Sequence, residues 1–178
     1  AKDKYRNKYK VIITPPFTVL ETYSKYFKNK QLDIGAQNCF QKDPYSSNTA
    51  AISSYMLRSV GAKYTLVGHS DNRSEGDTDS ILKDKVKSAL RNNLKVVFCI
   101  GENKIQKKSK RTLSVLKKQL TSVIEKKFNI NNIVVAYEPI WSIGTGKIPT
   151  ANELNKTTIH IKKILKNIFK KKNTTVLY

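Results

Sequence analysis

Short runs of apolar, mostly β-branched residues alternate along the chain with longer segments in which apolar residues recur every three or four positions. The runs Val96–Ile100 and Ile133–Ala136 are apolar at every position, which is typical of strands that are buried on both faces in a parallel sheet. The pattern predicts six strands, at residues 11–17, 32–38, 64–70, 95–102, 132–141 and 174–178.

Segments with helical periodicity separate these strands. In one of them Leu113, Leu116, Leu120 and Ile124 fall on a single helix face. Helices are expected at residues 18–29, 48–60, 77–92, 104–128 and 151–171. The alternation of strands and helices predicts right-handed βαβ units, and hence an α/β protein that is either a doubly wound sheet or a TIM barrel.

Lysine dominates the charge of the chain. The 34 Lys and Arg residues outnumber the 13 Asp and Glu residues, which gives a net charge of +21, and only five of the basic residues are arginine. In residues 162–172 the lysines alternate with apolar residues, as on the solvent-facing side of an amphipathic helix. Surfaces that bind nucleic acids favour the guanidinium group, so we favour a solvated lysine-rich surface over a nucleic-acid footprint.

The two cysteines, Cys39 and Cys99, lie on different apolar segments and have no neighbours at metal-ligand spacing. We therefore expect buried free thiols, no disulfide framework and no metal site. The sequence also contains no apolar run of membrane-spanning length and no signal-peptide pattern, so we expect no membrane partner.

A glutamate follows the fifth predicted strand. Glu138 is succeeded by a stretch with a proline, a tryptophan and two glycines, which is the composition of a loop with defined hinges. In a parallel α/β protein the carboxyl ends of the strands form the edge that carries chemistry. Glu138 is therefore a candidate general base, although a glutamate here can equally cap the next helix or pair with a lysine.

A histidine occupies the corresponding place after the third predicted strand, in the sequence Gly68-His69-Ser70-Asp71. A helix that begins at Asp71 or soon after it would place its positive N-terminus near the imidazole and favour the neutral ring. Taken alone, a histidine at this position is more often a structural residue held by hydrogen bonds than a functional one.

Together these segments resemble the triosephosphate isomerase family. The family signature Tyr-Glu-Pro-x-Trp-x-Ile-Gly-Thr-Gly-Lys is present in full at residues 137–147. Gly-His-Ser at 68–70, Ala-Gln-Asn at 36–38, Cys-Ile-Gly-Glu at 99–102 and Pro-Pro at 15–16 follow the family order. The resemblance implies an α/β fold of the TIM (β/α)8-barrel type. Residues 1–178 would be a single, incomplete barrel domain that covers roughly strands 2 to 7 of the family order.

The resemblance also implies an activity, that of an intramolecular aldose–ketose isomerase that interconverts dihydroxyacetone phosphate and glyceraldehyde 3-phosphate in glycolysis and gluconeogenesis. Glu138 resembles the proton-transferring base and His69 the neutral electrophile, a pairing for which this family is itself a standard example. Gly144 matches a contact to the substrate phosphate, and Asp71 and Cys99 match supporting residues. The matched residues of the closing lid are Pro139, Trp141, Ile143, Thr145, Gly146 and Lys147.

The partners implied by the resemblance are a small phosphorylated triose and a second copy of the chain, which Thr49 would contact. No cofactor, metal, nucleic acid or membrane is implied. The Gly-x-Gly-x-x-Gly motif of a Rossmann cofactor site does not follow an early strand. The implied location is the cytoplasm, or a plastid or other organelle if a targeting segment has been removed.

Several positions depart from the family pattern. Asp71 replaces a glutamate, Asn72 an arginine, and Pro149 an alanine in the second hinge of the lid. The interface loop reads Asn48-Thr49-Ala50-Ala51, where the family has an aromatic residue, Thr, Gly and Glu, which weakens the expectation of a dimer.

The six predicted strands include no counterpart of the family's first strand with its Asn-x-Lys, nor of its later Gly-Gly phosphate loops. We therefore expect the 178 residues alone to be inactive. The alternative function is a catalytically impaired, isomerase-like scaffold that binds an anionic ligand or partner. The presence of both His69 and Glu138 favours the isomerase.

Overall fold

The structure is a computed structural model that describes residues 9–28, 32–42, 48–170 and 174–178. Positions 29 and 171 of the expected helices, and position 172 of the lysine-rich stretch, lie outside the described residues. The chain forms two compact units. The first contains the residues up to Val67 together with Asp84–Val96, and the second contains Gly68–Lys83 together with Val97–Tyr178.

The first unit contains three parallel strands, β1 (Val11–Ile13), β2 (Leu32–Ala36) and β3 (Tyr64–Val67). Val11 lies opposite Leu32, and Gly35 lies opposite Tyr64. The connections contain η1 (Phe17–Val19), α1 (Leu20–Tyr26) and α2 (Ser54–Ser59). Four consecutive residues of β2 are buried, as expected for a strand that is covered on both faces.

The strand β4 (Lys95–Ile100) begins in the first unit and continues into the second, which also contains β5 (Ile133–Tyr137) and β6 (Val176–Leu177). Val135 of β5 lies opposite Val176 of β6 in a parallel pair. The strands follow one another in the sheet in the order in which they occur in the chain. Each of the six predicted ranges therefore contains a strand, but every strand is shorter than predicted, and Phe17, Ser70 and Ile140 already belong to short helices.

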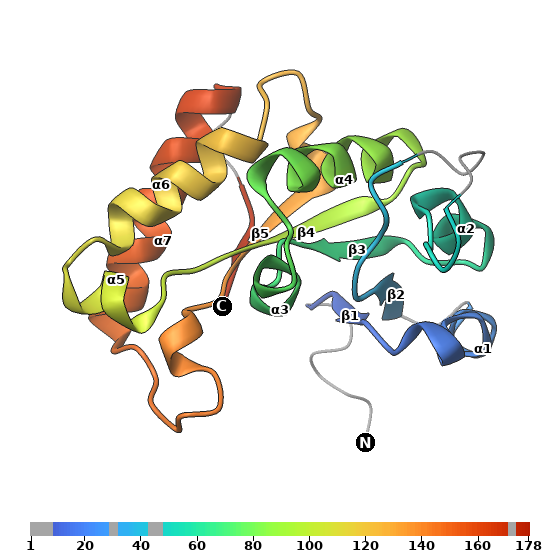
Figure 1. The fold of residues 1–178 in the computed structure, drawn as a ribbon, viewed down its shortest axis with the longest axis horizontal. Coiled ribbons are helices and arrows are strands. Elements are labelled where there is room, and N and C mark those ends of the chain that lie inside the picture. Colours follow the sequence, from blue (N-terminus) through green and yellow to red (C-terminus); the bar gives the residue numbers. More distant parts are fainter. Residues whose placement is uncertain (1–8, 29–31, 43–47, 171–173) are drawn as a thin grey trace. The chain divides into compact units, whose positions relative to one another are not determined.

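Helices cover the strands of the second unit. They are α3 (Ser70–Ser74), α4 (Asp79–Arg91, which continues into the first unit), α5 (Lys104–Lys108), α6 (Thr112–Val123), α7 (Ala151–Phe169) and the short η2 (Ile130–Asn132) and η3 (Ile140–Ser142). Figure 1 shows α6 and α7 side by side. Their fully buried residues pack with those of β4 and β5 to form the core of the unit: Phe98, Ile100, Leu116, Leu120, Val135, Ile161 and Leu165.

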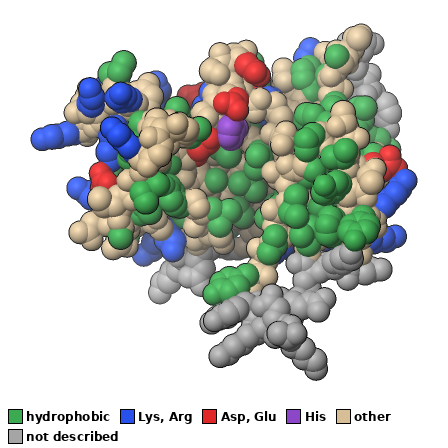
Figure 2. All heavy atoms as spheres, turned by 90° about the horizontal axis from the view of Figure 1, so that it is seen from below, with side chains coloured by type: hydrophobic (Ala, Val, Ile, Leu, Met, Phe, Trp, Pro, Cys, Tyr) green, Lys and Arg blue, Asp and Glu red, His purple; other side chains and the backbone are tan. Residues whose placement is uncertain are grey.

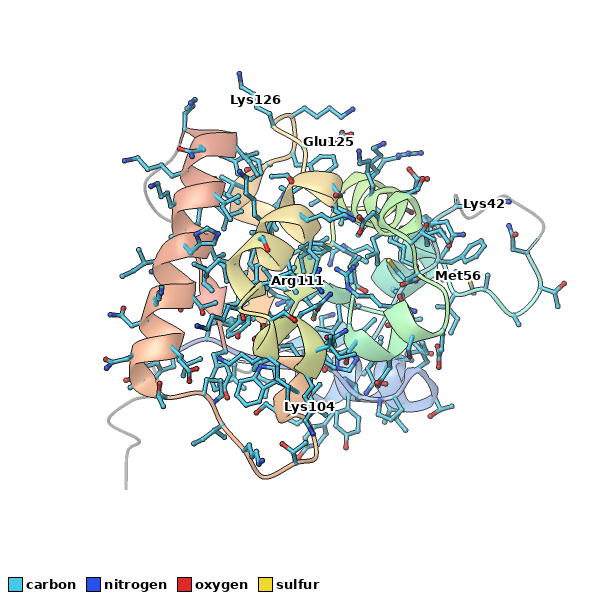
Figure 3. The ribbon with its side chains drawn as sticks, turned by 60° about the vertical axis from the view of Figure 1, so that its left-hand side comes forward. Lys42, Met56, Lys104, Arg111, Glu125 and Lys126 are labelled. Carbon is cyan, nitrogen blue, oxygen red and sulfur yellow. The ribbon has the colours of Figure 1, made fainter. Side chains whose placement is uncertain are left out.

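The lysines of α7 are on its solvent-facing side. Lys162, Lys163 and Lys166 are exposed, whereas Ile161, Ile164 and Leu165 are buried. Figure 3 likewise shows Lys126, between α6 and η2, pointing away from the ribbon. Among the described residues, none of the helices is both long and apolar enough to cross a membrane.

All five expected helices are shorter in the structure than predicted, and two of them differ in their organisation. The segment 104–128 contains two helices instead of one, because Lys110 adopts a left-handed conformation with φ 56° that ends the first of them. The segment 48–60 becomes helical only at Ser54, because the side chain of Ser53 accepts a hydrogen bond from the Met56 amide and so fixes the helix start there.

Candidate active site

A sharp turn after β3 places His69. Gly68 has a φ of +81°, and a Cβ atom at this position would lie 2.9 Å from Arg73 Nη2 and 3.1 Å from the Cys99 carbonyl oxygen. Glycine is required here both for the backbone conformation and for the close approach of its neighbours. His69 follows as the N-cap residue of α3, which begins one residue earlier than Asp71.

The hydrogen bonds of the His69 ring define its tautomer. The Asp71 amide donates to Nδ1 at 3.3 Å, so Nδ1 acts as an acceptor and the proton of the neutral ring is on Nε2. Nε2 lies 2.8 Å from Glu138 Oε1. A carboxylate oxygen of Asp71 is also 3.4 Å from Nδ1, but that contact is an ion pair only if the ring is charged. Because the amide must donate, its hydrogen bond supports the neutral ring.

Glu138 directly follows β5. Its amide donates to the Ile100 carbonyl oxygen at 2.8 Å, which joins the chain after β5 to the end of β4. The carboxylate oxygen Oε1 accepts a hydrogen bond from Ser70 Oγ at 3.1 Å in addition to its contact with His69. The side chain is 21% exposed and that of His69 is 33% exposed. Both side chains are therefore partly exposed, so a ligand can reach this carboxylate and imidazole; Figure 2 shows one face of the surface with its histidine and acidic side chains coloured by type.

Gly101 allows the backbone of Glu138 to approach β4. A Cβ atom at Gly101 would lie 1.8 Å from the Glu138 carbonyl oxygen and 2.7 Å from its carbonyl carbon. The side-chain amide of Gln119 on α6 holds the same residue, because it accepts from the Gly101 amide at 2.9 Å and donates to the Gly101 carbonyl at 3.0 Å. Both residues thus determine the position of Glu138 without reaching the surface at the site.

Arg73 connects the turn at His69 to β4. Its Nε donates to the Gly68 carbonyl at 2.7 Å and its Nη2 to the Cys99 carbonyl at 3.2 Å. The guanidinium also lies over the Phe98 ring, 5.7 Å from its centroid. Burial lowers the pKa of Arg73, and the nearby charge of Asp79 opposes that shift. Cys99 is buried, and burial together with the charge of Glu138 raises its pKa to about 12, so its side chain is a packed thiol.

A buried carboxylate on the chain after β4 holds the start of the expected lid. Glu102 is fully buried and accepts hydrogen bonds from Trp141 Nε1 at 2.8 Å, from the Tyr137 hydroxyl at 3.1 Å and from Thr112 Oγ1 at 3.2 Å. Burial, followed by the charge of Glu102, raises the pKa of Tyr137, so Tyr137 keeps its proton and remains a donor. The first hinge of the loop is therefore fixed by hydrogen bonds to one carboxylate.

The middle of the loop is exposed. Gly144 and Gly146 have φ values of +67° and +69°, and no atom lies within 4 Å of a Cβ built on either residue. Thr145 Oγ1 donates to the carbonyls of Trp141 and Ser142, and accepts from the Lys147 amide. These hydrogen bonds lie within the loop itself, so the structure keeps the loop compact while Gly144 faces solvent.

The second hinge leads into α7. Pro149 is buried, and Thr150 forms a capping box with Glu153, which secures the start of the helix. Lys107 of α5 forms an ion pair with Glu153 and lies 4.9 Å from the Trp141 ring centroid. Hydrogen bonds from Lys107 and Thr150 hold the pKa of Glu153 at about 2. Lys107 therefore contacts both the first hinge and the helix that follows the second.

Thr49, the remaining predicted residue, belongs to the first unit. It lies in an exposed turn, followed by Ala50 with a φ of 65°. Nearby, Asn38 Oδ1 accepts from the Cys39 amide and from Lys85 Nζ. Within the described residues, no group of three or more His, Cys, Asp or Glu side chains is arranged to hold a metal ion.

The structure thus brings His69, Glu138 and Cys99 together with the lid, and Asp71 contacts the histidine through its amide. The prediction missed the residues that hold them: Ser70, Arg73, Glu102, Lys107 and Gln119. Two of these had a signal in the sequence, because Ser70 and Glu102 are part of the quoted strand-end motifs. The other three residues have no such signal, and their hydrogen bonds and ring contacts are visible only in the folded structure: Arg73, Lys107 and Gln119.

The family model for triosephosphate isomerase matches residues 1–178. The chain belongs to the triosephosphate isomerase family. It is 35% identical over 164 residues to triosephosphate isomerase of Alkaliphilus oremlandii, covering 90% of this chain and 66% of the relative. It is 38% identical over 156 residues to triosephosphate isomerase of Saccharomyces cerevisiae, and the match covers 87% of this chain and 62% of the relative.

The fold agrees with this family assignment. A crystal structure of triosephosphate isomerase from Bartonella henselae matches with a TM-score of 0.88 and 28% identity, over 97% of this chain and 71% of that chain. The predicted fold class, part of a TIM barrel, is therefore confirmed. This member of the triosephosphate isomerase family spans about two thirds of the length of the curated relatives it matches.

Proposed function

We propose that the full-length protein is a triosephosphate isomerase that interconverts dihydroxyacetone phosphate and glyceraldehyde 3-phosphate. The observation that supports this best is the geometry of His69 and Glu138. A carboxylate oxygen and a neutral imidazole N–H lie 2.8 Å apart at one solvent-accessible edge, where a small carbonyl compound can contact both of them.

In the proposed reaction Glu138 is the general base. Its carboxylate takes a proton from the carbon next to the substrate carbonyl, and the electrons of the broken C–H bond form an enediolate. Return of the same proton to the neighbouring carbon completes the isomerisation, so no oxidant or cofactor is consumed. His69 supplies its Nε2 proton to the carbonyl oxygen on which negative charge develops.

The tautomer supports this role for His69. Because the Asp71 amide donates to Nδ1, the only ring proton is on Nε2, which is the nitrogen that lies toward Glu138. A neutral imidazole can donate this proton to the substrate and then recover a proton from the other substrate oxygen, which a permanently charged ring does less readily. Asp71 therefore acts through its backbone.

Glu138 must change its hydrogen bonds before it can act. Oε1 is engaged by both Ser70 and His69, so these two donors compete with a substrate C–H group for this oxygen. A substrate carbonyl that accepts from His69 would release one of these donors. We propose that movement of the loop 139–149 accompanies this exchange and brings the exposed Gly144 amide to the substrate phosphate.

The same proposal includes a homodimer in which the turn at Thr49 contacts the second copy. The exposure of this turn supports it. A Thr49→Arg variant of the full-length protein is expected to sediment as a monomer at concentrations where the wild type sediments as a dimer, and a monomeric wild type would contradict this part of the proposal.

The activity is tested by a coupled assay of the full-length protein with each triose phosphate. We expect a kcat/KM of at least about 10⁵ M⁻¹s⁻¹, within the usual enzymatic range. An impaired scaffold would instead bind the substrate and leave its conversion at the uncatalysed rate. That result, obtained with a folded full-length protein, would contradict the proposed function and favour the alternative.

A further inference from the structure

A cavity lies within the first unit. It has a volume of about 490 Å³ and lies between α1, β2 and the turn that leads from α2 into β3. Leu32 begins β2 and Lys63 directly precedes β3, so the cavity is at the amino ends of these strands. The active-site residues follow the carboxyl ends. Its volume is within the range of small-molecule sites in proteins.

One part of the cavity wall is apolar. Phe27, Leu32, Ile34 and Val60 line it, and Ile34 is 3% exposed. The Phe27 ring is held from the side by Tyr26, whose ring centroid lies 4.9 Å away in an edge-on arrangement. Such a wall can cover the apolar or aromatic body of a ligand.

The other part of the wall is cationic. Lys25, Lys28, Arg58 and Lys63 line the cavity, and the acidic residue among the lining residues is Glu21. Glu21 pairs with Lys25 at 2.6 Å. Lys28 and Arg58 have no carboxylate partner among the described residues, and Arg58 uses one nitrogen to donate to the Ala62 carbonyl. The guanidinium fork of Arg58 thus keeps donors for an anion.

Lys63, the remaining cationic residue of the lining, pairs with Asp33, and Asp33 also pairs with Lys10. Asp33 accepts from Lys63 through Oδ1 and from Lys10 through Oδ2, each at 2.7 Å. Burial raises the pKa of Asp33, but the hydrogen bonds from the two lysines outweigh burial and lower it, so Asp33 is ionised. The four basic residues that line the cavity and the one lining carboxylate, Glu21, leave a net charge of +3.

A buried hydroxyl adds an independent observation. Ser24 Oγ on α1 is buried and has no hydrogen-bond partner among the described residues. It lies in the cavity lining beside Gly61, whose φ is +97° and whose added Cβ would meet Ser24 Cβ at 2.8 Å. A small movement of α1 would open this hydroxyl to the cavity, where an acceptor atom of a bound ligand would satisfy it.

We propose that this cavity binds an organic phosphate of nucleoside-diphosphate size. The phosphate groups contact Arg58, Lys28 and Lys63, and the apolar body lies against Phe27 and Val60. A triose phosphate has no apolar body that could lie against Phe27 and Val60. The site is thus distinct from the active site in its place, in its residues and in the ligand that it selects.

The test is calorimetric titration of the full-length protein with ADP, pyrophosphate and adenosine at low ionic strength. ADP is expected to bind, and each of the other two at least about tenfold more weakly, because each lacks one half of the ligand. If pyrophosphate binds as tightly as ADP, the apolar wall does not contribute and that part of the proposal is overturned. If adenosine binds as tightly as ADP, the part that concerns the phosphate groups is overturned. No binding of ADP would overturn the whole.

Variants of the lining residues test whether ADP binds in this cavity. Arg58→Gln removes the guanidinium, Val60→Trp fills the cavity, and each should weaken ADP binding about tenfold or more. Arg111→Gln is the matched control, since Arg111 is exposed at the start of α6 (Figure 3), and it should leave binding unchanged within about twofold. An equal loss in Arg111→Gln, or retained binding in Val60→Trp, would overturn the assignment to this cavity. Lys28→Gln replaces Val60→Trp if the latter does not fold.

The kinetics of isomerisation separate this site from the active site. ADP bound in the cavity should leave the KM for triose phosphate unchanged, and the two cavity variants should keep the wild-type kcat. If ADP competes with the substrate, it binds at the active site and the proposal fails. This outcome would leave the proposed isomerase activity intact.

Discussion

Replacing Gly101 by alanine should displace Glu138, the proposed base. The added Cβ would lie 1.8 Å from the Glu138 carbonyl oxygen, whereas a carbon and an oxygen atom need a separation of about 3.3 Å. The backbone at Glu138 and the end of β4 must therefore separate by about 1.5 Å. The contact is between two backbone segments that are joined by the hydrogen bond from the Glu138 amide to Ile100, so no flexible side chain can absorb the shift.

Two quantities should change. Overpacking of a well-packed region costs about 1–3 kcal/mol of unfolding free energy, and the hydrogen bonds between Gln119 and Gly101 would be strained as well. A misplacement of the base by about 1 Å costs roughly 100-fold in rate. We therefore expect Gly101→Ala in the full-length protein to unfold at a lower urea concentration and to have a kcat reduced about 100-fold or more.

Urea unfolding and steady-state kinetics measure the two effects. Gly146→Ala is the control for stability, because no atom lies within 4 Å of a Cβ added at Gly146, although its φ is +69°. Only the left-handed backbone strain of about 1 kcal/mol is then expected. If Gly101→Ala has the urea midpoint of the wild type and a kcat within about twofold of it, the close approach of Gly101 to Glu138 does not determine the position of the base.

Three further predictions concern the second hinge, the start of α7 and the turn at Thr49. Pro149→Ala should change kcat and KM together, because proline fixes φ near about −65° and stiffens the hinge; unchanged values of both would show that this hinge does not limit turnover. Glu153→Gln should remove a pH-dependent part of the stability of about 1 kcal/mol, a value reduced for solvent screening. Since the folded pKa of Glu153 is lowered to about 2 from 4.5, the wild type should exceed this variant in unfolding free energy above pH 4.5 and lose the difference as the pH falls toward 2; a constant difference would contradict it. Ala50→Gly should raise the melting temperature, because the left-handed φ of 65° at Ala50 costs about 1 kcal/mol that glycine avoids; a lower melting temperature would show that the loss of chain entropy dominates.

The strands were predictable because they are apolar at consecutive positions. Val96–Ile100 has no polar residue, and a strand without a polar face is typical of a parallel sheet that is covered on both sides. The break between α5 and α6 was not predictable in this way, because Lys110 is an ordinary residue in the sequence and adopts its left-handed conformation only in the folded chain.

The residues of the candidate site likewise divide into those that the sequence could predict and those that it could not. His69 and Glu138 were predictable because each follows a buried strand, and strands in a parallel sheet end at a common edge. Gln119 was not, since its sequence context on α6 is that of any polar residue on a helix surface, and its two hydrogen bonds to Gly101 cross 18 positions of the chain. Lys107 is likewise one of many lysines, and only the fold places it beside both Trp141 and Glu153.

The most direct test of the account is the turnover of Glu138→Gln in the full-length protein. Glutamine keeps the shape of the side chain and can still accept from Ser70, but it cannot take a proton from carbon. We expect kcat to fall by at least about 10³-fold, while KM changes little. Asp84→Asn, which removes a carboxylate from an exposed position of α4, should retain wild-type kinetics. A Glu138→Gln enzyme within about tenfold of the wild type in kcat would contradict the assignment of Glu138 as the base.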